Sequence, residues 1–409
     1  MFSRGARMTI PLVLFGSALF IVNLGYGMFT PILPQYASRF GIDPAALGLA
    51  YSLYNVALII CLIPGGIMAD RVGRVKTIAV GMLLFALSSL MLVFVKDLFQ
   101  FAIARIIEGV SSALAIPAVF ALTADLVPAD QRGSGMGFTS TVETVGGLVS
   151  PTIGGLLAQA AGLAFPFYVT FFMGLVSAAL ILPIREQTRP PRSSSSESSP
   201  LARFRLLRRS ISGNRSLFAL SVRGFIVGIT QGLYVLVFVL YMTSRIKMQL
   251  AEIGFSFTLM SGAILAFTFL AGHLSDRFGR KPFVILGGII IASGILAFSF
   301  AHTASEIYLI SFALGLGIAL NNAPINALIA DCVASEIRAQ IMGGYEVIVG
   351  LGRALGVLLL GSLYGLSQAA PFNLSGALML VTVVLVMLFV AEQPSTRAAI
   401  SARQQEARI

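Results

Sequence analysis

A charged string of residues occurs twice in this very apolar chain, as GGIMADRVGRVK at 65–76 and as AGHLSDRFGRK at 271–281. The two copies lie 206 positions apart, and the aspartate, two glycines and two arginines of each copy keep that offset. A second pair of segments repeats at the same offset, ALTADLVPADQRGSGMG at 121–137 and ALIADCVASEIRAQIMG at 327–343. The chain is therefore predicted to consist of two parallel copies of one structural unit.

The composition places this unit in a membrane. Of the 409 residues, 57% are hydrophobic and 11% are charged, and the mean hydropathy is +0.90. A soluble domain carries about 25% charged residues, whereas a membrane-spanning helix needs roughly 20 mostly apolar residues. Twelve segments meet this requirement: about 9–37, 45–69, 77–95, 98–122, 134–159, 164–184, 216–242, 251–274, 283–301, 306–330, 340–366 and 372–391. We therefore expect an all-α membrane protein with twelve transmembrane helices in two pseudo-symmetric six-helix bundles.

One long polar gap separates the sixth segment from the seventh. Residues 185–215 include PPRSSSSESSP and eight arginines, so this stretch is too polar to span a membrane and too rich in Ser and Pro to form a core. The predicted domains are an N-terminal bundle at 1–184, a cytoplasmic linker at 185–215, a C-terminal bundle at 216–391 and a cytoplasmic tail at 392–409.

Lysine and arginine are shared unevenly between the two sides of the membrane. With a cytoplasmic N-terminus, the inner segments hold 21 of these residues and the outer loops hold four. Basic residues concentrate on the cytoplasmic side of membrane proteins, so both termini and both repeated loops are predicted to lie there, in the inner cell membrane. The net charge of +11 then reflects topology and not a nucleic-acid partner. The two cysteines and two histidines give no spacing typical of a metal site.

Four motifs together resemble those of the major facilitator superfamily, and the resemblance covers the whole chain. Both copies of the loop carry the G-x-x-x-D-R-x-G-R part of that superfamily's signature, G-x-x-x-D-R-x-G-R-x-K. LGYGMFTPILP at 24–34, RIIEGVSSA at 105–113 and GGLVSPTIGG at 146–155 resemble motifs of its twelve-helix drug:proton antiporters. In these motifs Glu108 stands where glutamine is commoner, and Ser150 replaces a glycine. The resemblance implies a secondary transporter that alternates between inward and outward access.

The repeated loops are predicted to form a cytoplasmic latch. Arg71 or Arg74 can pair with Asp125, and either arginine of the second loop can pair with Asp331. The glycines at 66 and 272 are expected to let a neighbouring helix approach closely. The latch candidates are Gly66, Asp70, Arg71, Gly73, Arg74, Asp125, Gly272, Asp276, Arg277, Gly279, Arg280 and Asp331. The resemblance implies that they close the cytoplasmic side; the alternative is that the arginines only reflect membrane topology.

Ionisable residues inside the apolar segments are functional candidates, because each costs at least ~2.5–3.5 kcal/mol to insert. The sequence analysis identifies five: Arg105, Glu108, Glu143, Glu346 and Arg353. Arg105 and Glu108 are three positions apart, so they share a helical face and can pair. We expect Arg105 with Glu108 or Glu143 to couple transport to protons. The alternative is a static buried salt bridge that fixes the packing of two helices.

Polar residues inside the spans are candidates for lining a substrate cavity or for bonding neighbouring helices. They are Asn23, Tyr26, Tyr54, Asn55, Gln231, Tyr234, Asn321, Asn322 and Asn326. In the fifth span, a bend is expected around Pro151 and its neighbouring glycines. The residues of this bend are Gly147, Pro151, Gly154 and Gly155.

The sequence thus predicts a monomeric secondary transporter whose partners are the lipid bilayer, a small-molecule substrate and protons. It is not predicted to be an enzyme, and it needs no cofactor beyond a proton gradient. The predicted function is proton-coupled export of small amphipathic or hydrophobic compounds, as in multidrug efflux. The alternatives are a carrier for a lipid, sugar or organic acid and, more remotely, a membrane enzyme or channel.

Overall fold

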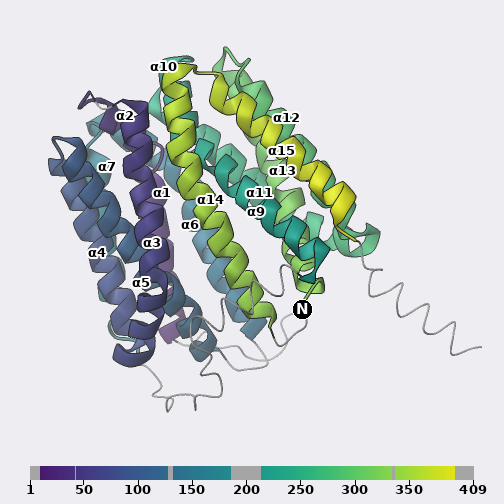
Figure 1. The fold of residues 1–409 in the computed structure, drawn as a ribbon. Coiled ribbons are helices and arrows are strands. Elements are labelled where there is room, and N and C mark those ends of the chain that lie inside the picture. The colour runs from purple at the N-terminus through teal and green to yellow at the C-terminus, as the bar shows by residue number, and fades with distance from the viewer. Residues whose placement is uncertain (1–9, 42, 128–131, 186–212, 334–336, 392–409) are drawn as a thin grey trace, which may run out of the picture. The chain divides into compact units, whose positions relative to one another are not determined.

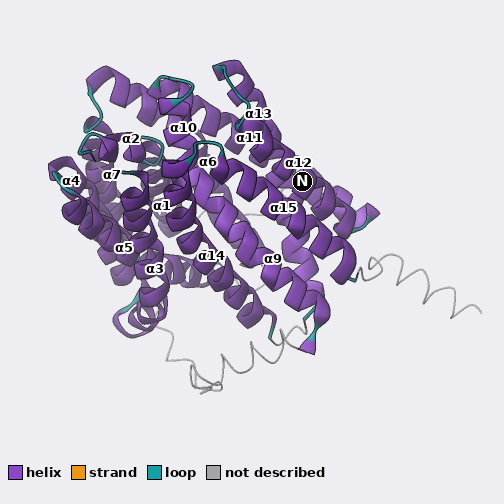
Figure 2. Cartoon of the chain, turned by 45° about the horizontal axis from the view of Figure 1, so that its top comes forward, coloured by secondary structure: helices purple, strands orange, loops and turns teal. Residues whose placement is uncertain are grey.

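The computed structural model describes residues 10–41, 43–127, 132–185, 213–333 and 337–391. Most of the predicted linker and all of the predicted tail lie outside these ranges. Within them the chain is built from helices joined by short loops, and no described residue lies in a strand (Figure 2).

Every one of the twelve predicted segments contains a helix (Figure 1). The helices of the first half are α1 (Ile10–Phe29), α2 (Leu33–Ser38), α3 (Pro44–Val72), α4 (Arg74–Phe94), α5 (Leu98–Leu126), α6 (Arg132–Ala161) and α7 (Phe165–Ile181). Those of the second half are α9 (Arg215–Gly232), the π-helix η2 (Leu233–Val237), α10 (Phe238–Ser244), α11 (Leu250–Phe278), α12 (Arg280–Phe298), α13 (Ala304–Asp331), α14 (Arg338–Leu366) and α15 (Ala370–Phe389). Among the described residues, ten helices are long and apolar enough to cross a membrane, and α7 is a shorter apolar helix. The prediction of an all-α membrane fold is confirmed.

Short polar side chains start several of these helices. The Asp43 carboxylate accepts a hydrogen bond from the Ala46 backbone N–H at 2.8 Å, and Asp97 does the same for Gln100 at 2.8 Å. These caps satisfy backbone donors that have no partner within the helix.

In each repeated loop, the glycine between the two arginines separates one long helix from the next. Gly73 separates α3 from α4 with φ of 113°, and Gly279 separates α11 from α12 with φ of 97°. Residues with a Cβ rarely adopt this conformation, which explains why the string D-R-x-G-R keeps its glycine in both copies.

Contacts group the helices into two compact units. Unit 1 holds residues 1–195 together with 234–258 and 357–366, and unit 2 holds the remainder. In unit 1, α4 packs on α5 and α7, α3 packs on α5, and α1 packs on α6 and α7 (Figure 1). In unit 2, α12 packs on α13 and α15, and α9 packs on α15.

The duplication extends to individual helix contacts. A Cβ added at Gly81 would lie 3.0 Å from the carbonyl oxygen of Ser111, and one added at Gly287 would lie 2.7 Å from that of Gly317. Both residues of the second contact lie 206 positions after those of the first. Within each unit, small residues therefore bring helix backbones together, as expected for helices that pack in lipid.

The prediction that Gly66 and Gly272 provide a close helix approach is wrong. A Cβ at Gly66 would lie 3.9 Å from Pro117 Cβ, and one at Gly272 would lie 3.8 Å from Ala323 Cβ, which are ordinary contact distances. The tight contact in the first copy is one residue earlier. There, a Cβ on Gly65 would overlap the carbonyl oxygen of Ala113. Because one residue turns the helix by about 100°, the sequence alone placed the contact on the wrong face.

These two adjacent glycines give a matched test of the packing. We expect Gly65→Ala to lower stability by about 1–3 kcal/mol, the usual cost of overpacking, because the obstructing atom belongs to the α5 backbone. We expect Gly66→Ala to leave stability nearly unchanged. Thermal unfolding of the purified protein in detergent measures both, and equal melting temperatures for the two variants would contradict the assigned helix face.

Candidate functional site

A buried ion pair lies inside α5. Arg105 and Glu108 are 4% and 0% exposed, and Arg105 Nη1 donates a hydrogen bond to Glu108 Oε2. The guanidinium also lies over the rings of Tyr51 and Tyr54 from α3, 4.8 Å from each ring centroid. The two aromatic faces stabilise the cation beyond what the carboxylate contributes. The predicted Arg105–Glu108 pair is therefore present, and α3 encloses it.

Several polar atoms around this ion pair have no hydrogen-bond partner among the described residues. They are Glu108 Oε1, Arg105 Nε, Tyr51 Oη and Asn55 Oδ1. Each buried polar group without a partner costs about 1–3 kcal/mol. The fold tolerates this cost in a small region where α3 and α5 meet, which distinguishes the region from ordinary helix packing.

A cavity of about 430 Å³ lies next to the ion pair, within unit 1. Four of the predicted site residues line it: Asn23 and Tyr26 from α1, Tyr54 from α3 and Glu143 from α6. Tyr54 connects the two features, because its ring contacts Arg105 and its hydroxyl lies 3.2 Å from Ser112 Oγ in the cavity wall. The Glu143 carboxylate forms no ion pair with another described residue. The wall of the cavity therefore combines aromatic side chains with one carboxylate that has no described ion-pair partner.

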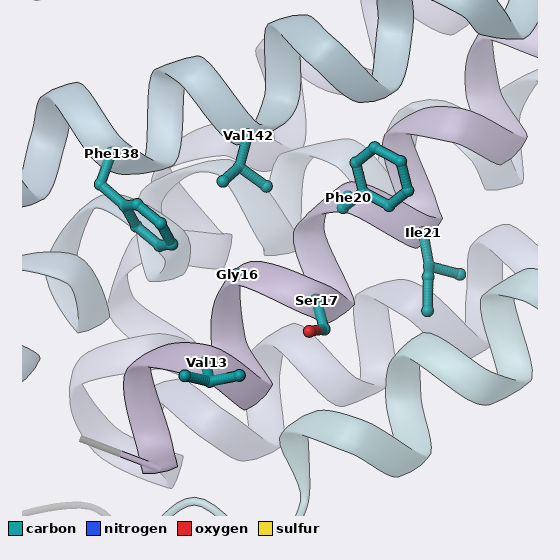
Figure 3. Close-up of a pocket in the computed structure, with 7 residues that line it drawn as sticks. All are labelled: Val13, Gly16, Ser17, Phe20, Ile21, Phe138 and Val142. Carbon is teal, nitrogen blue, oxygen red and sulfur yellow. The ribbon is translucent and has the colours of Figure 1, made fainter. Parts of the chain in front are cut away.

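A second hollow, of about 460 Å³, lies between α1 and α6 (Figure 3). Its lining residues are Val13, Gly16, Ser17, Phe20, Ile21, Phe138 and Val142. Figure 3 shows Phe138 and Val142 on α6 with Gly16 on the facing turn of α1, and a Cβ at Gly16 would come within 2.8 Å of the Phe138 ring. Ser17 is the one polar side chain among these lining residues, so the wall of the hollow is mostly apolar.

Unit 2 contains a different arrangement of charges. Arg353 on α14 donates from Nε to the Gln231 side chain of α9 at 2.9 Å, so these two predicted residues meet. Glu346, on the same helix as Arg353, is exposed. Asn322 and Asn326 are also exposed. Tyr234, which belongs to unit 1, has a buried hydroxyl without a described hydrogen-bond partner.

One intramembrane charge, Arg223 on α9, was not predicted from the sequence. This residue is 3% exposed, and it donates hydrogen bonds to the Tyr345 hydroxyl at 3.1 Å and to Asn321 Oδ1. Asn321 in turn donates to the Val284 carbonyl at 3.0 Å, so it bonds neighbouring helices. The criterion that identified the other five charges applies equally to Arg223, because it too lies within an apolar segment.

The two latch regions have the same geometry. Arg74 pairs with Asp125 and donates to the Ala121 carbonyl at 3.3 Å. Arg280 pairs with Asp331 and donates to the Ala327 carbonyl at 2.9 Å. In each copy it is the second arginine of the D-R-x-G-R string that forms the pair, a choice that the sequence left open.

The other latch residues are placed as follows. Asp70 and Arg71 are exposed, and neither forms an ion pair with a side chain that the structure describes. Asp276 lies 3.5 Å from Arg280 but is 67% exposed. Arg277 lies over the Phe278 ring at 5.4 Å. The first arginine of each string therefore lies outside the paired core of the latch.

The glycines near Pro151 hold α6 against other segments of unit 1. A Cβ on Gly154 would overlap the Met28 carbonyl of α1, and one on Gly155 would overlap the Leu250 carbonyl of α11. Nothing lies within 4 Å of a Cβ at Gly147. On the α11 side, a Cβ on Gly254 would overlap the Pro151 carbonyl. These contacts explain the glycines, and the predicted bend at Pro151 stays a prediction.

An equivalent contact joins α3 to α14, also within unit 1. A Cβ on Gly361 would lie 2.8 Å from the Pro44 carbonyl, and one on Gly48 would lie 2.7 Å from the Val357 carbonyl. Each of these four residues lies 206 positions from its counterpart in the α6–α11 contact. Unit 1 therefore contains two repeat-related helix crossings, which we call the paired crossings.

Duplicated helical bundles of this kind, with buried charges beside a cavity, define a membrane transporter. A model of the Major Facilitator Superfamily matches residues 15–243 and 220–408. The chain belongs to that superfamily, and it is accordingly a transporter and not an enzyme.

Two relatives are multidrug or quinolone resistance proteins. Quinolone resistance protein NorA of Staphylococcus aureus is 24% identical over 375 residues, which cover 90% of this chain and 94% of that protein. Multidrug resistance protein 2 of Bacillus subtilis is 26% identical over 381 residues, which cover 91% and 93%. The similarity to both extends over nearly the full length of the chain.

Solved structures show the same fold at lower sequence identity. The nucleoside transporter NupG aligns with a TM-score of 0.78 at 14% identity, covering 93% of this chain and 99% of that one. A D-xylose–proton symporter aligns with a TM-score of 0.74 at 18% identity, covering 95% and 99%. At these identities the similarity establishes the fold alone.

The contribution of the Arg105–Glu108 pair to stability can be tested by removing one partner and then both. Arg105→Met leaves Glu108 buried without a cation and is expected to cost about 3–5 kcal/mol, whereas the double variant Arg105→Met/Glu108→Leu should recover most of that loss. Thermal unfolding in detergent measures both variants. A double variant as unstable as the single one would show that the pair itself stabilises the fold.

Proposed function

We propose that this transporter exports small amphipathic compounds in exchange for protons. The observation that carries the proposal is the Arg105–Glu108 pair beside a cavity that contains the unpaired Glu143. A carboxylate at membrane depth is costly in its charged form, and an adjacent arginine favours that form. Glu108 is therefore subject to two opposing influences on its protonation, as a group that loads and releases protons requires. Glu143 has no paired cation among the described residues, so only the cost of the charged form acts on it.

The cavity suits a cargo with an aromatic or apolar body. Tyr26, Tyr54, Phe85 and Phe120 line it, and Ser111 adds a polar group to the wall. A few polar groups set in an otherwise apolar wall are typical of small-molecule sites. The names of the two relatives refer to quinolone and multidrug resistance. They support drug efflux over the alternative, a carrier for a lipid, sugar or organic acid.

Alternating access is supported by two sets of contacts. The paired crossings join α6 to α11 and α3 to α14 through backbone contact, and Thr152 and Thr258 add a 2.8 Å hydrogen bond to the first crossing. The latch pairs, Arg74–Asp125 and Arg280–Asp331, lie next to the C-terminal ends of α3 and α11. The paired crossings lie at the N-terminal ends of these two helices. We propose that the latch closes one face of the membrane and the paired crossings close the other.

The excess of basic residues in the loops supports placing the latch at the cytoplasmic face, with both termini on that side. We further propose that the transporter works as a monomer in the inner membrane.

The coupling residues can be tested in cells that lack their own drug pumps. We expect Glu108→Gln and Glu143→Gln each to reduce energised efflux of norfloxacin at least tenfold, because neither amide exchanges a proton at physiological pH. Glu346→Gln is the matched control, since Glu346 is an exposed acid on α14. The readout is cellular norfloxacin fluorescence before and after the proton gradient is collapsed.

Unchanged efflux by both glutamine variants, at equal expression in the membrane, would contradict the assignment of the coupling residues. Efflux by the wild-type protein that continues after the gradient is collapsed would contradict proton coupling itself. A panel that includes ethidium, which lacks a carboxylate, tests the breadth of the cargo in the same assay.

A further inference from the structure

Arg353 is a membrane-embedded cation without a carboxylate partner among the described residues. It lies near the middle of the 29-residue α14 and is partly exposed. Its Nε donates to Gln231 Oε1 at 2.9 Å, which leaves the two terminal nitrogens free of hydrogen bonds to described residues. A charge at this depth is retained for a function by default, and a forked pair of N–H donors matches a planar carboxylate.

The backbone around this arginine is held in place by glycines. Those at 352 and 356 lie so close to α9 that an added Cβ would overlap the carbonyl oxygens of Phe225 and Ile229. A Cβ on Gly228 would lie 3.0 Å from the Arg353 backbone nitrogen. The crossing of α9 and α14 is therefore fixed, and with it the direction from Arg353 to Gln231. Such preorganisation lowers the entropic cost of binding a ligand.

The first bundle shows that this crossing needs no polar pair. The equivalent crossing joins α1 to α6, where a Cβ on Gly146 would lie 2.8 Å from the Phe20 carbonyl. The residues 206 positions before Gln231 and Arg353 are Gly25 and Gly147, neither of which has a polar side chain. Arg353 and Gln231 are therefore an addition to the shared scaffold and not a requirement of it.

A second arginine of unit 2, which is buried, provides a contrast. Arg223 is 3% exposed and donates to both Tyr345 and Asn321, so its guanidinium is enclosed by the protein. Arg353 donates one hydrogen bond to a described residue, from Nε to Gln231. Helix α9 ends one residue after Gln231, where the π-helix η2 begins. Short π-helical segments are frequent at functional sites.

We infer that Arg353, positioned by Gln231, binds the carboxylate of the transported compound. This inference rests on the proposed export of amphipathic compounds and narrows it to those that carry a carboxylate, as acids or as zwitterions. The two terminal nitrogens of Arg353 hold the two carboxylate oxygens, and Gln231 keeps the guanidinium plane in a fixed orientation. Glycine at the equivalent positions of the first bundle explains why this selectivity belongs to unit 2.

Equilibrium binding of three matched probes tests the inference. The probes are radiolabelled 4-phenylbutyrate, 4-phenylbutylamine and 4-phenylbutanol, which differ only in the head group, and the full-length protein is held in a non-ionic detergent. We expect wild-type protein to bind the acid at least tenfold more tightly than the amine or the alcohol. Arg353→Gln should lose at least tenfold in affinity for the acid and little for the alcohol.

Two further variants separate recognition from folding. Arg353→Lys keeps the charge but loses the fork, and we expect an intermediate loss in affinity for the acid. Gln231→Leu should lower the affinity for the acid severalfold without altering the affinity for the alcohol. Leu355→Ala, at an exposed apolar position of α14, is the control that should match wild type. Thermal unfolding checks that each variant is folded.

Acid affinity within twofold of wild type in a folded Arg353→Gln variant would overturn the inference, as would wild-type protein that prefers the amine. The assay needs neither a proton gradient nor transport. Selective binding of the acid together with absent gradient-driven efflux would therefore leave this site standing while contradicting the proposed function.

Discussion

Close backbone contact at glycines is the constraint on which the rest of this structure depends. Helices already in lipid gain little from burying apolar side chains against one another, so they associate through tight packing and internal hydrogen bonds. Gly81 against Ser111 and Gly287 against Gly317 show this contact at equivalent places in the two units. The same type of contact recurs in the paired crossings. The duplication of the sequence is therefore a duplication of packing sites.

Against this shared scaffold, the intramembrane charges differ between the two halves. Arg105, Glu108 and Glu143 of the first half have Ser311, Leu314 and Val349 at the equivalent positions of the second. Arg353 of the second half has Gly147 in the first. The equivalent helices of the other copy pack without these charges, so the charges are not needed for packing. Because they cost free energy in the membrane, we infer that they are retained for transport. We propose that the acidic residues of the first half carry protons and that Arg353 of the second half binds the carboxylate of the cargo.

The helices were predictable because a run of about 20 apolar residues leaves the backbone few alternatives in a membrane. The latch pairs were partly predictable, because the 206-residue offset linked Arg280 to Asp331 as it linked Arg74 to Asp125. The sequence left open which arginine of each string forms the pair. That choice depends on helix rotation, as does the close contact that falls at Gly65 and not at Gly66.

The candidate site was less predictable than the fold. Asn23, Tyr26, Tyr54 and Glu143 meet at one cavity as expected, but Asn321 bonds a buried arginine that the sequence analysis missed. The aromatic cage of Tyr51 and Tyr54 around Arg105 could not be anticipated, because residues on different helices meet only through the rotation of both. The type of a side chain indicates the free-energy cost of placing it in a membrane. Which of these side chains meet is decided by the rotation of the helices that carry them.

Proton-coupled export, the central claim, is tested most directly by recording proton and drug movement together. Proteoliposomes that hold a trapped pH indicator receive an imposed pH gradient, and norfloxacin fluorescence is followed at the same time. We expect protons to cross the membrane in the direction opposite to norfloxacin, with a fixed ratio, and Glu143→Gln to abolish the coupled movement. Norfloxacin transport at an unchanged rate with no accompanying proton flux would contradict proton-coupled export.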